Sequence, residues 1–480
     1  MRKYLIAFSI FLLHAVVFSQ HKSLLYDFYE IPQSLLLNPG VRASYQWYAG
    51  VPLASGISVQ AGTSGIAVND IFAQDGLDIN DKIRDRAVYG LTSRDDVSST
   101  IQLELLSGGF RDPNRDDTFY SFGWYIEQDV INYWPRDLAV LAWEGNAGRY
   151  GERFRLSHLK TRGEANSVFH FGINRQMNRQ LTLGARAKIY SGIYHFSSTR
   201  NRGYLLTQEG INNLVSNTLV ADMRLQTSGI AALEDGADSD AGLSSTLMKR
   251  ALLGGDLGLG VDLGFTWAVN QQLLITGSLL DVGFMLHSGD VRTFTLKGRA
   301  TVEGVEVILP QALADPNADF WEDLVDEIEE LIPFEEENSS YVSFRPTKLY
   351  GSVRYDFGEP SAGGGQQSCD CDVGTTGGAE LNNTYRNAVG GQLFLINRPR
   401  GPQAAITGFY LRRIGNFLAL KGTYTADKYN LANLGLGLNV QAGPIQFYVL
   451  ADNLLGYRNI ANSHYASVQF GLNILSWGSK

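Results

Sequence analysis

Cysteine is nearly absent from this sequence, which has two such residues, Cys369 and Cys371, in a chain of 480. So few thiols exclude a small secreted scaffold held together by disulfides. Two thiols could ligate a soft metal, but no further cysteine and no nearby histidine completes such a site. A local disulfide, or an ordinary flexible loop, is the simpler expectation.

Basic stripes and long apolar runs are also missing. The formal net charge is −9, and eleven carboxylates without a single base fall between Asp315 and Glu337. An acidic chain of this kind argues against nucleic acid as a partner. After residue 19, no apolar run approaches the length of about eighteen residues that a transmembrane helix needs.

Recognisable catalytic motifs do not occur either. The chain contains neither Gly-x-Ser-x-Gly nor a P-loop. Its histidines form no recognisable metal pair. Only His170 is expected to face an interior from a well-defined strand, and a hydrogen-bonded structural histidine explains it. We therefore expect no enzyme, no metal and no cofactor.

The first residues have the pattern of a secretory signal peptide. Arg2 and Lys3 form a basic start, Leu5–Phe18 is almost entirely apolar, and small residues at the −3 and −1 positions favour cleavage before Gln20. The run is too short to span a bilayer. Residues 1–19 are therefore predicted to be removed, and the exported chain should be soluble or a β-barrel.

Glycine, aromatic residues and period-two alternation are abundant. The chain holds 52 Gly, 24 Phe and 23 Tyr. In Asn433–Asn453, aliphatic side chains alternate with small or polar ones on both sides of Gly443-Pro444, which predicts two strands joined by a tight turn. Leu257–Val269 alternates in the same way and is longer than a globular strand needs to be. These aliphatic faces pack either on a second layer of a soluble sandwich or on lipid.

The lengths of the connections favour the membrane alternative. Short links alternate with long loops, as at the two rims of an outer-membrane barrel, whose short turns are periplasmic. Starting from a first strand that rises from the periplasm, the alternation predicts an all-β transmembrane antiparallel barrel of about fourteen strands, with a range of 12–16 because residues 128–165 and 196–254 could each contain a further hairpin. The strands predicted besides the hairpin are Ser55–Ala61, Val97–Leu106, Thr118–Glu127, Val168–Asn174, Leu181–Tyr190, Leu257–Val269, Leu273–Leu286, Lys348–Phe357, Val389–Ile396, Ala404–Leu411, Phe417–Thr425 and Ala466–Ile474.

The barrel is predicted to occupy residues 54–480, after a proline-broken N-terminal hatch at 20–53. Residues 288–340 are predicted to be an extracellular insertion with an acidic amphipathic helix at 316–332. This helix is either a lid packed on neighbouring loops or a docking surface for a basic partner or divalent cations. Residues 358–383 are predicted to be a Gly-rich periplasmic loop.

Several motifs resemble those of one family. They are SLLLNPG (Ser34–Gly40), LLDVGF (Leu279–Phe284) and GPIQFYVLADNLLG (Gly443–Gly456). Their order is similar to that in Bacteroidota outer-membrane barrels classed as domain of unknown function 5723. That family is similar in architecture to the long-chain fatty acid transporter class, which includes the type IX secretion shuttle protein PorV. Asn38-Pro39-Gly40 stands here where that class usually has Asn-Pro-Ala. The resemblance implies an outer-membrane barrel with an N-terminal hatch, and no specific activity.

Charged candidate residues lie on the polar faces of two predicted neighbouring strands. Arg186 and Lys188 belong to one strand and Asp262 to the next, and their distances from the turns place them at similar height. Either they form a site for an anionic head group, or they are a structural ion pair that braces the interior.

A second candidate group belongs to the C-terminal hairpin. Tyr448 and Asp452 share the polar face with Gly435 and Gly437 of the preceding strand. A ring that lies over glycines fills a curved sheet, so packing is the simpler interpretation. A role in lining a ligand site is the alternative.

The function predicted from these features is the passage or binding of a small apolar or amphipathic molecule by a barrel surrounded by outer-membrane lipid. The alternative is a structural barrel whose extracellular loops dock secreted or surface proteins, in association with type IX secretion. Both predictions rest on architecture.

Overall fold

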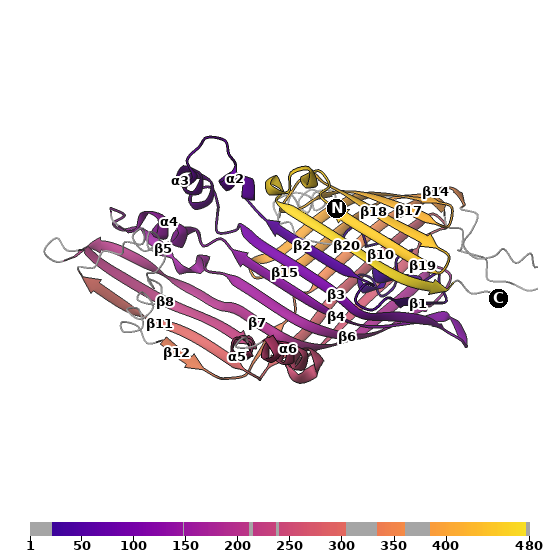
Figure 1. Ribbon diagram of the computed structural model, residues 1–480, viewed down its shortest axis with the longest axis horizontal. Coiled ribbons are helices and arrows are strands. Elements are labelled where there is room, and N and C mark those ends of the chain that lie inside the picture. Colours follow the sequence, from indigo (N-terminus) through magenta and orange to yellow (C-terminus); the bar gives the residue numbers. More distant parts are fainter. Residues whose placement is uncertain are drawn as a thin grey trace, which may run out of the picture.

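The computed structural model describes residues 22–146, 148–210, 215–236, 240–303, 334–360 and 385–476. Its strands close into an antiparallel barrel of 14 strand positions (Figure 1). The ring closes where the last strand pairs with the first. All the predicted strands are confirmed. In chain order the wall consists of β1 (Trp47–Gly50) with β2 (Ile57–Thr63), β3 (Asp96–Asp112), β4 (Arg115–Tyr133), β6 (Thr161–Gln176), β7 (Leu181–Glu209), β9 (Asp256–Ala268), β10 (Leu273–His287), β13 (Tyr341–Phe344) with β14 (Lys348–Pro360), β15 (Tyr385–Arg398), β16 (Gly401–Ile414), β17 (Leu418–Ala426), β18 (Asn433–Ala442), β19 (Ile445–Asp452) and β20 (Tyr465–Ser476).

The helices are short and lie in the hatch and in the connections between strands. None of those in the described part of the chain is both long and apolar enough to cross a membrane. They are η1 (Pro32–Leu36), α2 (Val68–Phe72), α3 (Ile79–Lys82), η2 (Ile83–Val88), α4 (Arg136–Glu144), η3 (Leu156–His158), α5 (Ile230–Gly236), α6 (Asp240–Lys249), η5 (Arg250–Gly254) and η6 (Gly456–Asn462).

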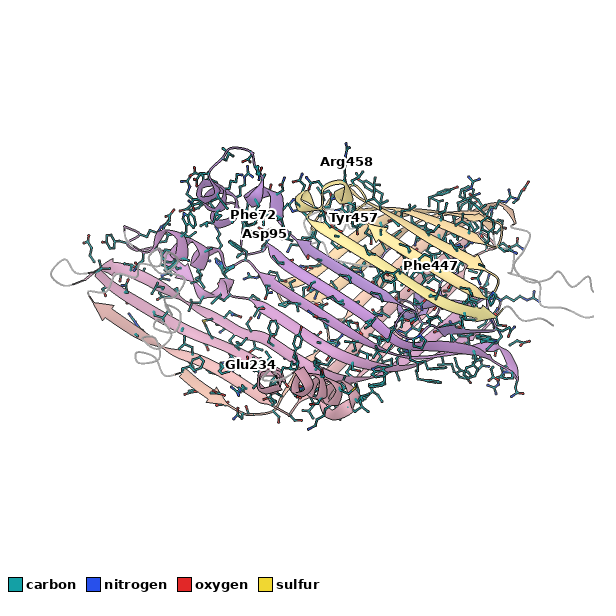
Figure 2. All side chains as sticks on the ribbon, in the orientation of Figure 1. Phe72, Asp95, Glu234, Phe447, Tyr457 and Arg458 are labelled. Carbon is teal, nitrogen blue, oxygen red and sulfur yellow. The ribbon has the colours of Figure 1, made fainter. Side chains whose placement is uncertain are left out.

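The aliphatic faces of the strands point away from the barrel. Along β9 every second residue from Leu257 to Trp267 is between 37% and 55% exposed, whereas Asp262 between them is completely buried. On β19, Phe447 is 43% exposed and lies on the outside of the C-terminal strands (Figure 2). A soluble sandwich would cover these faces with a second layer. An outward apolar face is what lipid requires, so the membrane alternative is the one that this wall fits.

The first wall position corrects the predicted end of the hatch at residue 53. β1 already pairs with β20 and β3, so Trp47–Gly50 belongs to the wall. The strand is interrupted before β2, where Pro52 has no N–H to give to a ladder. Leu53 in the same interruption has φ +65°. The name hatch is used below for residues 22–45.

A sheet extension beyond the barrel was not predicted. β7 has 29 residues, more than the 9–11 or so that cross a bilayer. Its outer half pairs with β8 (Val215–Ser228) and β5 (Arg153–Arg155), and β8 in turn pairs with β11 (Val291–Glu303), which pairs with β12 (Phe334–Glu337). These strands project past the barrel at the rim of the long loops (Figure 1). Residues 196–254 and 288–303 are therefore largely sheet and helix, and not simple loops.

Several predicted features lie outside the described residues. These are the signal peptide at 1–19, the acidic helix at 316–332, and both cysteines. Of the predicted Gly-rich loop, residues 358–360 are the end of β14 and the rest lie outside the described part.

An outward apolar band has a measurable consequence. Leu263 is 50% exposed in the middle of β9. An arginine at the bilayer midplane costs about 2–4 kcal/mol, so Leu263→Arg should lower the folded fraction in lipid, measured as heat-modifiable mobility on gels. Leu455→Arg is the matched control, because Leu455 is 64% exposed beyond the end of β19. Equal losses in the two variants would contradict the band.

Candidate functional site

The hatch fills the barrel interior near the rim of the short turns. Leu24, Tyr26, Phe28 and Ile31 have no exposed surface. Tyr26 stacks on Tyr350 of β14 with ring centroids 4.8 Å apart. The hatch side chains share one apolar cluster with residues of β10, of β14 to β17 and of β19. The hatch is thus a second layer for the inner face of these strands.

Backbone carbonyls of the hatch are satisfied by side chains of the wall. Apart from η1 the hatch has no regular structure, so most of its carbonyls need partners from elsewhere. The donors come from strands around the barrel, and two of the longest, Arg186 and Arg354, are buried charges. The contacts are Arg186 to Leu36 O (3.1 Å), Arg354 to Asp27 O (3.0 Å), Gln392 to Tyr26 O (3.1 Å), Lys421 to Ser23 O (3.0 Å), Ser278 to Leu37 O (2.6 Å) and Asn174 to Pro39 O (2.8 Å).

The Asn-Pro-Gly motif of the hatch sits in a slot between two wall glycines. Gly184 of β7 and Gly264 of β9 are directly opposite each other in the sheet. A Cβ at Gly184 would collide with the carbonyl of Pro39, and one at Gly264 with the side chain of Asn38. Both wall glycines lie close to their short turns. The slot therefore fixes the position of the hatch by close backbone approach.

The predicted residues Arg186, Lys188 and Asp262 are in contact. Arg186 and Asp262 are register partners, and both the Arg186–Asp262 pair (3.1 Å) and the Lys188–Asp262 pair (2.8 Å) are buried. Lys188 also pairs with Asp281 at 2.6 Å. Each charged group faces an opposite charge, as buried ions must. Arg186, Lys188 and Asp262 are called the brace below. The brace also holds the hatch, because Arg186 donates to Leu36 O, and it leaves neither cation free for an anionic head group.

The brace belongs to a longer chain of alternating charges that sequence reasoning missed. It continues from Asp281 across the interior to other strands, with nitrogen–oxygen distances between 2.5 and 3.4 Å. The further pairs are Lys348–Asp281, Lys348–Glu127, Arg345–Glu127, Arg345–Glu164 and Arg162–Glu164. Glu127 could have been found, since it follows Tyr125 on the inward side of a predicted strand. Arg345 could not have been found in this way, because it precedes the predicted strand Lys348–Phe357.

Asp281 faces inward because the sheet is irregular there. The pairing of β10 with β9 shifts between Leu279 and Val282, and Asp281 has φ +58°. Its N–H donates to Asp262 at 2.8 Å. The bulge re-aims one side chain into the interior. The sequence signal was the broken alternation in LLDVGF.

His170, Tyr448 and Asp452 are inward and buried. The ring of Tyr125 lies 5.8 Å from that of His170. Tyr448 does not lie over Gly435 and Gly437 as predicted. It lies beside Gly471 of β20 and donates to the carbonyl of Ser55 at 3.1 Å.

The two hairpin glycines have a different use. Gly437 makes room for Phe28 of the hatch and Leu450, and Gly435 for Asp452 and Leu24. Packing thus accounts for the small residues on this face, with the hatch as the partner that sequence alone could not place.

Asp256, His287 and Ser343 form an unpredicted hydrogen-bonded array near the long-loop rim. His287 Nδ1 is 2.8 Å from Asp256 Oδ2, and its Nε2 is 2.8 Å from Ser343 Oγ. The atoms follow the order of a serine hydrolase triad. The imidazole, however, is 1% exposed and packs against the rings of both His195 (4.4 Å) and Tyr341 (4.5 Å). A triad histidine has to reach the leaving group with Nε2, and here no surface is left for that approach.

Metal ligation finds no support in the described residues, among which no three His, Cys, Asp or Glu side chains are grouped to hold an ion. His195 and His287 stack on each other, and His287 is bonded to Asp256. These contacts are those of a packed polar interior.

Comparisons with known proteins place the chain by family. A family model, described as a family of unknown function, DUF5723, matches residues 39–452. No curated protein matches the chain. Similar solved structures include a mutant of the TodX monoaromatic hydrocarbon channel (10% identity, TM-score 0.40, 93% of this chain and 94% of that one), the toluene transporter TbuX of Ralstonia pickettii (9%, 0.38, 93% and 93%) and a FadL homologue of Pseudomonas aeruginosa (9%, 0.38, 93% and 94%). The family predicted from the motifs is confirmed.

The glycine slot predicts how the hatch can be loosened. Gly264→Val forces the hatch away from β9, and overpacking of this kind costs about 1–3 kcal/mol. Chymotrypsin should then cleave at the buried Tyr26 and Phe28 about ten times faster, because the hatch opens more often. Gly351→Val is the control, since a Cβ there meets open space. Equal cleavage of both variants would show that the slot does not hold the hatch.

The buried imidazole predicts that Ser343 is not an activated nucleophile. A fluorophosphonate probe should leave the folded protein unlabelled, as judged by mass spectrometry. Ser343→Ala, with the same fold on gels, sets the background. Labelling of Ser343 in the unchanged protein would refute the structural interpretation of the array.

Proposed function

The chain belongs to DUF5723, a family of unknown function, and we propose from its own geometry that it is a gated barrel of the outer membrane. It passes or binds a small apolar or amphipathic molecule, and the hatch controls access. The observation that carries this proposal is that the hatch closes the interior without being part of the wall.

The wall strands pair with one another and need no residue of the hatch. The pairings begin at Trp47, and residues 22–45 contact the wall through side chains. The hatch can therefore leave while every wall ladder stays intact.

With the hatch in place the cavity beside it is too small for cargo. The cavity beside the hatch, between Lys22, Tyr125, Asp281 and Tyr350, measures about 60 Å³. Ligand pockets usually have about 300–1,000 Å³. Passage thus needs a displaced hatch.

Displacement would uncover a surface suited to an apolar chain. The hatch covers inward apolar side chains, most of them in the second half of the barrel, and the chain of buried charges lies beside them. The apolar side chains are Leu280, Tyr350, Phe394, Ile396, Leu411 and Leu450. An inner wall with an apolar part beside a charged part suits an amphipathic molecule.

A second candidate function is the docking of secreted or surface proteins at the long-loop rim. The extension of β7, β8, β11 and β12 favours it, because a bilayer does not require strands that reach past the barrel. The extension supplies a broad sheet outside the lipid. The gate and the docking surface lie on different parts of the protein, so one does not exclude the other.

The gate is tested by removing it. Deletion of residues 22–45 should raise the uptake of a fluorescent fatty-acid analogue into liposomes that contain the barrel, by at least about tenfold if the hatch is the main obstacle. Unchanged uptake through a barrel that still shows heat-modifiable mobility would contradict the gate.

Gly264→Val gives the same test without a deletion. It should raise uptake in the same direction, while Gly351→Val should not. Uptake that rises equally for a large polar sugar would show that a general leak had been opened.

A further inference from the structure

The extension continues the inner face of the barrel past its rim. On β8, Ser228 bonds to the buried Asp256 inside the barrel. Side chains on a strand share a face at every second residue, so Arg224 and Asp222 lie on that same inner side. Their register partners on β7 are Arg200 and Arg202. These charges are therefore presented over the mouth of the barrel.

A cleft of about 420 Å³ opens between this face and the rim. Besides Arg200 and Arg202 it receives Lys160, from the segment before β6, and Arg400, from the turn between β15 and β16. The complete lining is Ser157, Lys160, Thr199, Arg200, Asn201, Arg202, Asp222 and Arg400. Segments far apart in the chain thus bring four cations and one carboxylate to one place. This group is called the basic cleft.

The cations of the basic cleft are held by neutral groups. Lys160 Nζ donates to Ser198 O at 2.5 Å, and Arg400 donates to Ser157 O at 3.0 Å and His158 O at 3.2 Å. Burial, and then the charge of Arg400, lower the pKa of Lys160. Converging cations repel one another unless an anion is present.

The one carboxylate does little to neutralise the group. Asp222 is 3.7 Å from Arg200, and the side chains of Arg200 and Asp222 are 50% and 30% exposed. Such surface pairs contribute little. In the part of the chain that the structure describes, Lys160, Arg202 and Arg400 form no ion pair within 4.0 Å. The contrast with the barrel interior is clear, since every cation of the brace there meets a carboxylate.

We propose that the basic cleft binds an oxyanion, such as a phosphate, carried by the head group of an amphiphile or free in solution. Arginine guanidinium groups suit this ligand because their planar N–H donors match its oxygens two at a time. The volume accommodates a head group. The inference goes beyond the gate, because binding at the rim needs no displaced hatch.

The test measures binding of dodecyl phosphate and of inorganic phosphate to the full-length protein in a neutral detergent by calorimetry. Arg200→Gln/Arg202→Gln should weaken binding about tenfold or more, because two charge-assisted contacts are lost. Arg299→Gln/Arg458→Gln is the control. It removes two exposed cations that do not line the cleft and should change binding far less.

Asp222→Asn should change the affinity for phosphate in the opposite direction, because removing the repelling carboxylate should tighten binding. Tight binding of dodecyl phosphate alone identifies the source as a head group, and equal binding of inorganic phosphate identifies a free ion. The proposal is overturned if neither probe binds saturably to the unchanged protein, or if both double variants weaken binding equally. Heat-modifiable mobility of each variant confirms that the barrel is folded.

Discussion

An irregular segment buried inside a barrel depends on its carbonyl groups finding donors. Turns within the hatch satisfy some of its carbonyls, such as those of Lys22, Leu25 and Phe28. The remaining carbonyls need donors from the wall, because an unpaired buried carbonyl costs about 1–3 kcal/mol. Long side chains of the wall supply these donors, among them Arg186, Arg354 and Lys421. Each brings a charge into the interior, and Arg186 and Arg354 have carboxylate partners in Asp262 and Asp356. The polar composition of this lumen thus follows from what it has to hold.

Period-two alternation was enough to find the wall, because lipid outside and a packed interior inside act on every strand alike. The alternation of short and long connections then gave the strand count. The period-two pattern failed where pairing was local and brief, as in β1 within the expected hatch, and where strands left the lipid, as in β8 and β11. There the apolar signal that lipid imposes is gone. On β8, Val220 shares a face with Asp222 and Arg224, so the apolar side chains do not keep to one side of the strand.

Candidate residues could be foreseen in pairs but not as a network. Arg186 and Asp262 were adjacent on counted strands, so register alone joined them. Asp281 needed a bulge, and Arg345 needed a strand from the far side of a long insertion. The partners of Gly435 and Gly437 came from the hatch, at the other end of the chain. Contacts across a closed barrel are set by its curvature, which no local pattern contains.

The difference between the brace and the basic cleft lies in their partners and not in their residue types. Arginine and lysine line both, and the sequence marked only the brace as a place for an anion. In the brace, burial makes an unpaired charge so costly that each cation comes with a carboxylate. At the rim, water and a single partly exposed Asp222 let four cations converge with one carboxylate among the residues that line the cleft. A folded interior favours neutral networks, whereas a site for an outside ion has to keep its charge uncompensated until the ion arrives. A count of partners therefore separates structural charge from available charge, and it moves the expected anion site from the lumen to the mouth of the barrel.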